Sequence, residues 1–139
     1  MAIKYLLDTN VVSEPVRKEP NPKVIVQLEA AAGEIAIAAT TWHELLFGVL
    51  RMEKSQRRTA LEQYLFGAIQ QEVSILPYDV AAATWFSQER ARLSKQGLMP
   101  SYPDGQIAAV AAVNDLILVT RNVNDFAEFS NLQMANWFT

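Results

Sequence analysis

The sequence contains no cysteine and only one histidine, His43, among its 139 residues. Without cysteine the chain has no thiol nucleophile, no disulfide and no cysteine-based zinc site, which agrees with a reducing compartment. A single histidine also excludes a two-histidine acid–base nuclease and a cluster of imidazole metal ligands within one chain. Any catalytic chemistry must therefore depend on carboxylates.

The chain also lacks a long hydrophobic run. No stretch of eighteen apolar residues is free of charge, and the N-terminus shows none of the regions of a signal peptide. We therefore expect a soluble protein of the cytoplasm with no membrane attachment. A length of 139 residues, half of them hydrophobic, suits a single domain spanning 1–139.

The charge balance is slightly acidic, with a formal net charge of −3. This argues at first against a nucleic-acid partner, because phosphate binding normally shows as a basic surface. Bound divalent cations would offset the negative charge and leave the basic residues free to form a track. Those residues fall in two stretches that otherwise read as solvated helix faces: Arg51, Lys54, Arg57 and Arg58, then Arg90, Arg92 and Lys95.

Apolar segments with strand character alternate with segments of helical periodicity. The expected strands are 3–8, 35–39, 73–76 and 116–120, with an edge strand at 132–137; the expected helices are 22–33, 41–50, 56–71, 79–97 and 104–114, and a short one follows within 121–126. Alternation of this kind predicts an α/β fold, with a central, mainly parallel sheet between two layers of helices.

Four acidic residues fall at the ends of these predicted elements. Asp8 ends the first strand, Glu44 begins the helix after the second, Asp104 begins the helix before the fourth, and Asp125 follows the fourth. In open α/β sheets the functional crevice lies outside the carboxyl ends of the strands, so these side chains can share one site. Taken singly, each acid also has a structural explanation. Asp8 could form an Asx-turn, and Glu44 could form a capping box with Thr41. Asp104 could be a first-turn acid, and Asp125 could cap a short helix. Their joint occurrence favours a functional site.

Four ordered blocks extend this pattern over nearly the whole chain: LLDTNVVSE, TTWHELLFG, PDGQIAAVA and LVTRNVNDF. Together they resemble the PIN-domain nucleases, and particularly the VapC toxins of bacterial type II toxin–antitoxin modules. The resemblance implies a PIN-like three-layer α/β/α fold. It also implies that Asp8, Glu44 and Asp104 are catalytic, metal-binding acids.

The fourth acid of the resemblance is less direct. Many relatives have an aspartate immediately after the Thr-Arg pair, where this chain has Asn122, and Asp125 lies three residues further on. We predict that Asp125 is the fourth catalytic and metal-binding acid, with Asn122 beside it. Thr9, Asn10 and Thr120 match the polar residues that support the site in the family. Arg121, next to the predicted site, is the candidate for contact with an RNA phosphate.

A ring of carboxylates suits magnesium, a hard cation that prefers oxygen ligands and water, and manganese is a potential substitute. By resemblance, the activity is magnesium-dependent endonucleolytic hydrolysis of RNA that leaves a 5′-phosphate and a 3′-hydroxyl. The resemblance further implies a small antitoxin protein as partner, and a homodimer. An alternative is a PIN-like module that binds RNA or protein without cutting, because Asn122 departs from the family pattern. We expect His43 to serve in packing or in partner contact.

Overall fold

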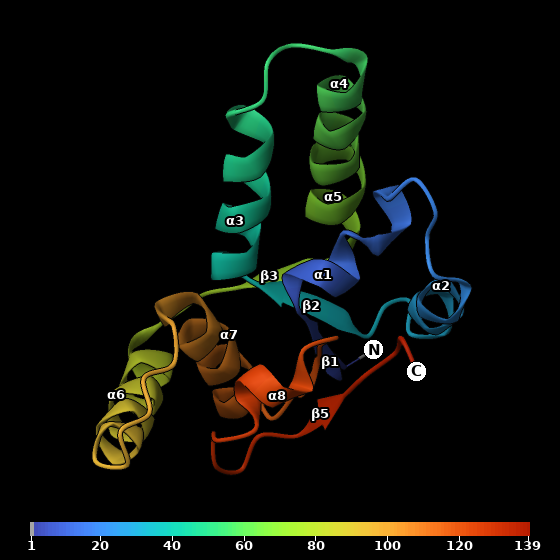
Figure 1. Ribbon diagram of the computed structural model, residues 1–139. Helices are drawn as coiled ribbons and strands as arrows, with labels where there is room; N and C mark the ends of the chain where they lie inside the picture. Colours follow the sequence, from blue (N-terminus) through green and yellow to red (C-terminus); the bar gives the residue numbers. More distant parts are fainter. Residues whose placement is uncertain (1) are drawn as a thin grey trace.

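The computed structural model describes residues 2–139, which fold around a sheet of five parallel strands (Figure 1). The strands lie in the order β3-β2-β1-β4-β5. Their bounds are β1 (Tyr5–Leu7), β2 (Ile35–Ala38), β3 (Ser74–Leu76), β4 (Ile117–Val119) and β5 (Met134–Ala135). The predicted parallel sheet is therefore confirmed, and because β1 lies at its centre, the residues that follow β1 reach the middle of one edge.

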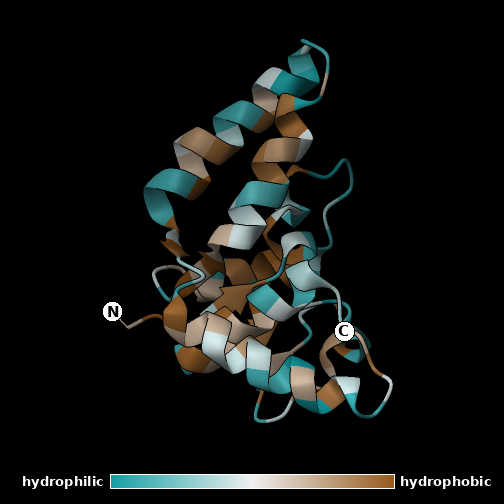
Figure 2. Cartoon of the chain, turned by 90° about the vertical axis from the view of Figure 1, so that its left-hand side faces the viewer, coloured by the Kyte–Doolittle hydropathy of each residue, from teal (hydrophilic) through white to brown (hydrophobic). Residues whose placement is uncertain are grey.

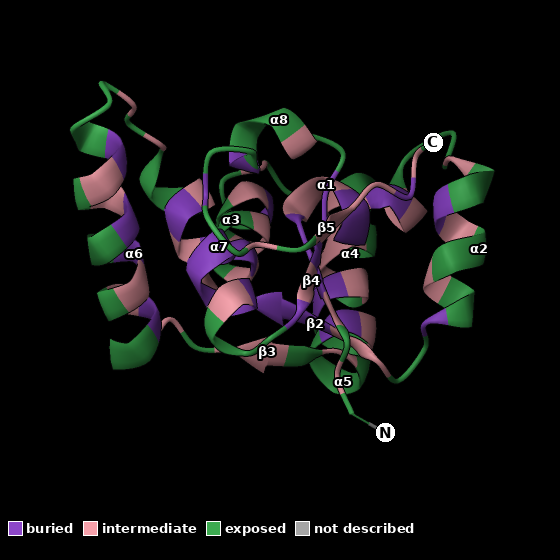
Figure 3. Cartoon of the chain, turned by 90° about the horizontal axis from the view of Figure 1, so that it is seen from below, coloured by how far each residue is buried: buried purple, intermediate pink, exposed green. Residues whose placement is uncertain are grey.

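Alternate side chains of the strands bury against different layers of helices. Leu6 and Leu118 pack against α6 (Val80–Ser94) and α7 (Tyr102–Val113). Leu7 and Val119 point to the opposite face. That face packs on three further helices, α1 (Thr9–Val12), α2 (Pro22–Ala30) and α3 (Ala39–Leu50). Figure 2 shows the apolar strands between these layers, and Figure 3 shows that α6 turns its buried side toward the core. This is the expected three-layer α/β/α arrangement.

A helical hairpin projects from the sheet beyond α1 (Figure 1). Its first arm is α3, and its second consists of α4 (Gln56–Gln63), a π-helical segment η2 (Tyr64–Ile69) and α5 (Gln70–Glu72). Ser55 caps α4 by accepting a hydrogen bond from the amide of Arg58 at 3.0 Å. The predicted helix over 56–71 is present, but its π-helical middle was not predicted.

Two predicted helix starts differ from the structure, and both lie at the carboxyl edge of the sheet. The helix α3 begins at Ala39 rather than Thr41, and α7 begins at Tyr102 rather than Asp104. The remaining short elements are η1 (Glu14–Val16) and α8 (Val123–Phe126). Over the described residues, none of the helices has the length and apolar character needed to span a membrane.

Candidate active site

Asp8 is held at the end of β1 by contacts on both of its carboxylate oxygens. Its Oδ1 accepts a hydrogen bond from the amide of Thr9 at 2.8 Å, so Asp8 caps the short helix α1. Its Oδ2 accepts one from the hydroxyl of Thr120 at 2.8 Å, and Thr120 follows β4 and is fully buried. The amide of Asn122 donates to the same hydroxyl oxygen at 3.0 Å. Thr120, which we predict as polar support for the site, thus orients the Asp8 carboxylate.

Glu44 faces Asp8 from α3. The hydroxyl of Thr9 donates to Oε1 of Glu44 at 3.3 Å and so connects the two acidic segments. Because α3 starts at Ala39, Glu44 lies in the second turn of the helix and forms no capping box with Thr41. The hydroxyl oxygen of Thr41 is instead buried without a hydrogen-bond partner. The structural explanation for Glu44 is thus wrong, and its carboxylate remains available at the site.

Asp104 lies in the first turn of α7. Ser101 is the N-cap of this helix, and its hydroxyl oxygen accepts a hydrogen bond from the amide of Asp104 at 3.2 Å. The expectation that Asp104 itself begins the helix is therefore wrong by two residues. Burial raises the pKa of Asp104, and the charges of Asp8 and Asp125 add to this rise, while the hydrogen bond with Ser101 opposes it.

Asp125 is exposed in the short helix α8, whose N-cap is Asn122. Asp125 is not a cap, so its structural explanation is also wrong. Asn122 is exposed and makes no side-chain cap bond. The charge of Asp125 contributes to the raised pKa of Asp104, so Asp125 lies near that acid.

The four acids form one electrostatic cluster at the carboxyl edge of the sheet. The pKa of Glu44 is raised by withdrawal of its carboxylate from water, and next by the charges of Asp8 and Asp104; the Thr9 hydrogen bond and the neighbouring His43 oppose this rise. Mutual repulsion of this kind is the condition that a bound cation relieves.

The donor set fits magnesium. Within residues 2–139 no three His, Asp or Glu side chains stand close enough to form a finished metal cage. Magnesium does not require one, because it usually keeps several waters and binds through one or two carboxylates. The amide oxygen of Asn10 is also buried beside this edge without a hydrogen-bond partner and is a further oxygen acceptor.

Three features of the site were not predicted. The hydroxyl of Thr40 donates to Oε1 of Gln106 at 2.9 Å and joins the first turn of α3 to the second turn of α7. Ser101 caps α7, and the sequence signal for it was the spacing Ser101-x-x-Asp104. Gly105 packs so closely on Phe86 that an added Cβ would overlap the ring. These contacts set the position of Asp104 relative to Glu44.

The basic residues Arg121, Arg92 and His43 make different contacts. Arg121 is exposed, but its guanidinium lies 4.9 Å from the centre of the Phe138 ring and pairs with none of the four acids. Arg92 donates two hydrogen bonds to Glu89 and one to the Glu128 carbonyl, so it is structural. His43 is exposed on α3 and stacks on Phe47, which excludes a role in the core.

Comparison with known proteins gives one consistent family. The model of the PIN domain matches residues 5–132. The chain is 32% identical to ribonuclease VapC2 of Haemophilus influenzae, over 97% of this chain and 98% of that protein. It is 34% identical to toxin FitB of Neisseria gonorrhoeae, over 87% and 89% of the two chains. The crystal structure of FitAcB from Neisseria gonorrhoeae superposes with a TM-score of 0.88 at 31% identity, covering 96% of this chain and 98% of that one. The chain therefore belongs to the PIN-domain family and, within it, to the VapC group.

Proposed function

We propose that this protein is the toxin of a type II toxin–antitoxin module and acts as a magnesium-dependent endoribonuclease. The observation that carries the proposal is the cluster of Asp8, Glu44, Asp104 and Asp125 at the carboxyl edge of a PIN-domain sheet, where the charges of neighbouring acids contribute to the raised pKa values of Glu44 and Asp104. The ribonuclease VapC2 and toxin FitB relatives support the same activity. The cluster also favours cutting over RNA binding alone, because uncompensated acids repel a phosphate.

In this proposal the chain's own residues divide the work. Asp8, Glu44, Asp104 and Asp125 would hold magnesium, one or two of them directly and the others through its bound waters, with manganese as a substitute. Bound there, the ion would lower the pKa of a water and stabilise negative charge on the phosphate.

The supporting residues keep the acids in place. Thr120 fixes the rotamer of Asp8 through its 2.8 Å hydrogen bond, and Thr9 joins Asp8 to Glu44. Asn10 and Asn122 supply amide oxygens next to the acids. Arg121, exposed after β4, is the proposed contact for an RNA phosphate.

We propose two protein partners, an antitoxin and a second copy of this chain. A free ribonuclease in the cytoplasm, where we place it, would damage its own cell unless a dedicated antitoxin bound it. The helical hairpin offers an apolar surface for this protein, since Leu50 is 54% exposed and Phe66 is 41% exposed. A groove beside Phe66 is lined by Thr59, Glu62, Gln63 and Gly67. We also propose that the protein is a homodimer.

The proposal is tested by charge removal at nearly constant shape. Asp8→Asn, Glu44→Gln and Asp104→Asn should each abolish RNA cleavage by the purified protein, because each removes a metal-binding charge. Cleavage is measured on labelled RNA with magnesium, with manganese and in chelator. Expression without antitoxin should arrest growth for the unmodified chain but not for these variants.

The fold serves as the internal control. Glu44→Gln and Asp104→Asn remove a repelling charge and should leave thermal unfolding unchanged or slightly raise its midpoint. Asp8→Asn also loses an acceptor for Thr9 or Thr120, so its fold is checked separately by circular dichroism. Full cleavage by a well-folded Asp8→Asn variant would contradict the assignment of the site. Cleavage that continues in chelator would contradict the metal mechanism.

A further inference from the structure

Tyr102 is an exposed aromatic residue that lies two positions before Asp104. It occupies the first position of α7, and 57% of its surface is exposed. Phe86 meets its ring edge-on, with centroids 6.1 Å apart. An exposed ring in the same helical turn as a catalytic acid is well placed to meet a substrate that reaches the acid.

Arg90 fixes this ring from α6. Its guanidinium lies 4.6 Å from the centre of the Tyr102 ring, and one of its nitrogens donates a hydrogen bond to the tyrosine hydroxyl at 2.7 Å. No carboxylate within residues 2–139 pairs with Arg90, whereas Arg92, two residues on, is bound to Glu89. Of the two, Arg90 thus retains a positive charge available to a phosphate.

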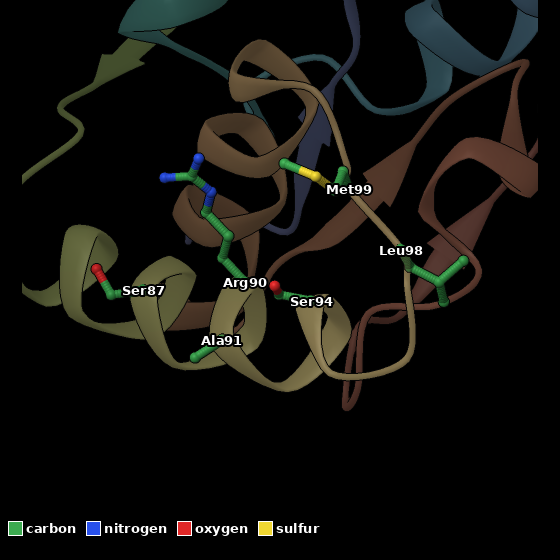
Figure 4. A pocket seen from close by; sticks show the side chains of 6 residues that line it. All are labelled: Ser87, Arg90, Ala91, Ser94, Leu98 and Met99. Carbon is green, nitrogen blue, oxygen red and sulfur yellow. The ribbon is translucent and has the colours of Figure 1, made fainter.

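A groove continues from Arg90 along α6. It has a volume of about 330 Å³ and is lined by Ser87, Arg90, Ala91 and Ser94 of α6 and by Leu98 and Met99 of the loop before α7 (Figure 4). In this view the Arg90 side chain rises from α6 toward α7, and Met99 extends toward it. Ligand pockets generally measure roughly 300–1,000 Å³, so the groove has room for one nucleotide.

We infer that Tyr102, Arg90 and this groove form a subsite for the RNA strand that flanks the cleaved bond. A base stacks on Tyr102, Arg90 contacts the adjoining phosphate, and the groove receives the continuing strand. The inference rests on the proposed function, and the residues have the chemistry of single-strand binding, in which aromatic rings stack on bases and cations follow the backbone. Because Tyr102 and Arg90 touch the substrate and not the metal, they position it.

The inference is tested with single-stranded RNA and the purified protein. Tyr102→Ala should raise the Kd, measured by fluorescence anisotropy in chelator, by at least about fivefold, since stacking on one base is worth about that much or more. In magnesium the same variant should raise KM with little change in kcat. Tyr102→Phe keeps the ring and should bind nearly as the unmodified chain does.

Two further readouts separate stacking from a purely structural contact. RNAs that carry 2-aminopurine at successive positions should show quenched fluorescence at one position, and Tyr102→Ala should remove the quenching. Arg90→Gln should reduce the slope of log Kd against log salt by about 0.7, the value for one phosphate contact to a single strand. Phe47 of α3, which is 58% exposed, provides a matched Phe47→Ala control that should change neither quantity.

The outcomes are distinguishable. If the unmodified protein cuts RNA and Tyr102→Ala binds and cuts equally well, the subsite is refuted while the proposed function stands. If Phe47→Ala weakens binding as much as Tyr102→Ala does, the effect is general and the subsite is refuted as well. If the unmodified protein neither binds nor cuts RNA, both proposals fail together.

Discussion

At the scale of single residues, the segment after β4 decides how the acidic cluster is completed. Asn122 stands where many relatives have an aspartate, and its backbone amide is tied to the Thr120 hydroxyl at 3.0 Å. Asp125 lies one turn further on, in α8, where its charge contributes to the raised pKa of Asp104. Neither side chain caps α8, so substitutions at these positions report on the site and little on the helix.

We predict opposite effects for the two substitutions. Asp125→Asn should raise the magnesium concentration needed for half-maximal cleavage by about 10- to 100-fold, in the range seen when a residue supporting a metal site is lost. Asn122→Asp should leave this concentration unchanged or lower it, because it adds a carboxylate beside Asp8. The measurement is a magnesium titration of cleavage, with folding checked by circular dichroism. An unchanged magnesium dependence in Asp125→Asn would remove Asp125 from the site.

At the scale of secondary-structure elements, the contact between α6 and α7 holds Asp104 in place. Gly105 follows Asp104 and is buried against the ring of Phe86, so α7 approaches α6 more closely than a residue with a side chain would permit. The hydrogen bond from Thr40 to Gln106 then joins the same turn of α7 to α3. Two independent contacts thus locate this turn between its neighbours.

Gly105→Ala should therefore destabilise the fold and impair the site. Overpacking of a core costs about 1–3 kcal/mol, and movement of α7 would displace Asp104, so both the free energy of unfolding and kcat/KM should fall. The matched control is Gly48→Ala in α3, where an added Cβ meets nothing within 4 Å. That change should raise stability by roughly 0.5–1 kcal/mol, because alanine is the better helix former. Urea unfolding measures the free energy of unfolding of both variants. Equal effects of Gly105→Ala and Gly48→Ala would contradict the close packing of Gly105 on Phe86.

At the scale of the whole molecule, Glu89 joins α6 to the chain that follows α8. It is 7% exposed, and its Oε1 accepts hydrogen bonds from the amide and the hydroxyl of Ser130 at 2.6 and 2.8 Å. Arg92 donates to both carboxylate oxygens. These contacts, led by the Arg92 hydrogen bonds, lower the pKa of Glu89 from 4.5 to about 2. The charged form of Glu89 therefore stabilises the folded state.

The lowered pKa of Glu89 predicts how the free energy of unfolding depends on pH. The contribution of Glu89 is fully present above its unfolded pKa of 4.5 and is lost as the pH falls through about 2. Glu89→Gln should lower the free energy of unfolding at neutral pH and flatten its dependence on pH between these values. Chemical unfolding at several pH values measures this.

The control for Glu89 is Glu62→Gln, which removes the partner of Arg58 in an ion pair on α4. The Glu62 side chain is 39% exposed, and ion pairs of this kind contribute at most about 1 kcal/mol, so its effect should be small at every pH. A Glu89→Gln variant with the pH profile of the unmodified protein would contradict the stabilising role of the Glu89 charge.

Local sequence patterns were enough to predict the class of fold and to single out the acids proposed for the site. Short apolar segments alternating with helical periodicity predict strands and helices from local properties, and a carboxylate such as Asp8 at the end of a buried strand is visible in the chain. Caps formed by neighbouring residues were equally accessible, as Asn21 and Asp79 show by accepting backbone hydrogen bonds at the starts of α2 and α6.

How these parts meet follows from contacts between segments that are distant in the sequence. The strand order and the hydrogen bond between Asp8 and Thr120, 112 residues apart, depend on packing between distant segments, which no local pattern records. The start of α3 was missed for the same reason: Thr41 looked like a cap, but its hydroxyl is buried in the core and the helix begins two residues earlier. The contact between Tyr102 and Arg90 also depends on the packing of α6 against α7. The buried faces of the two helices set which exposed side chains lie next to each other, and the sequence of either helix alone does not show this.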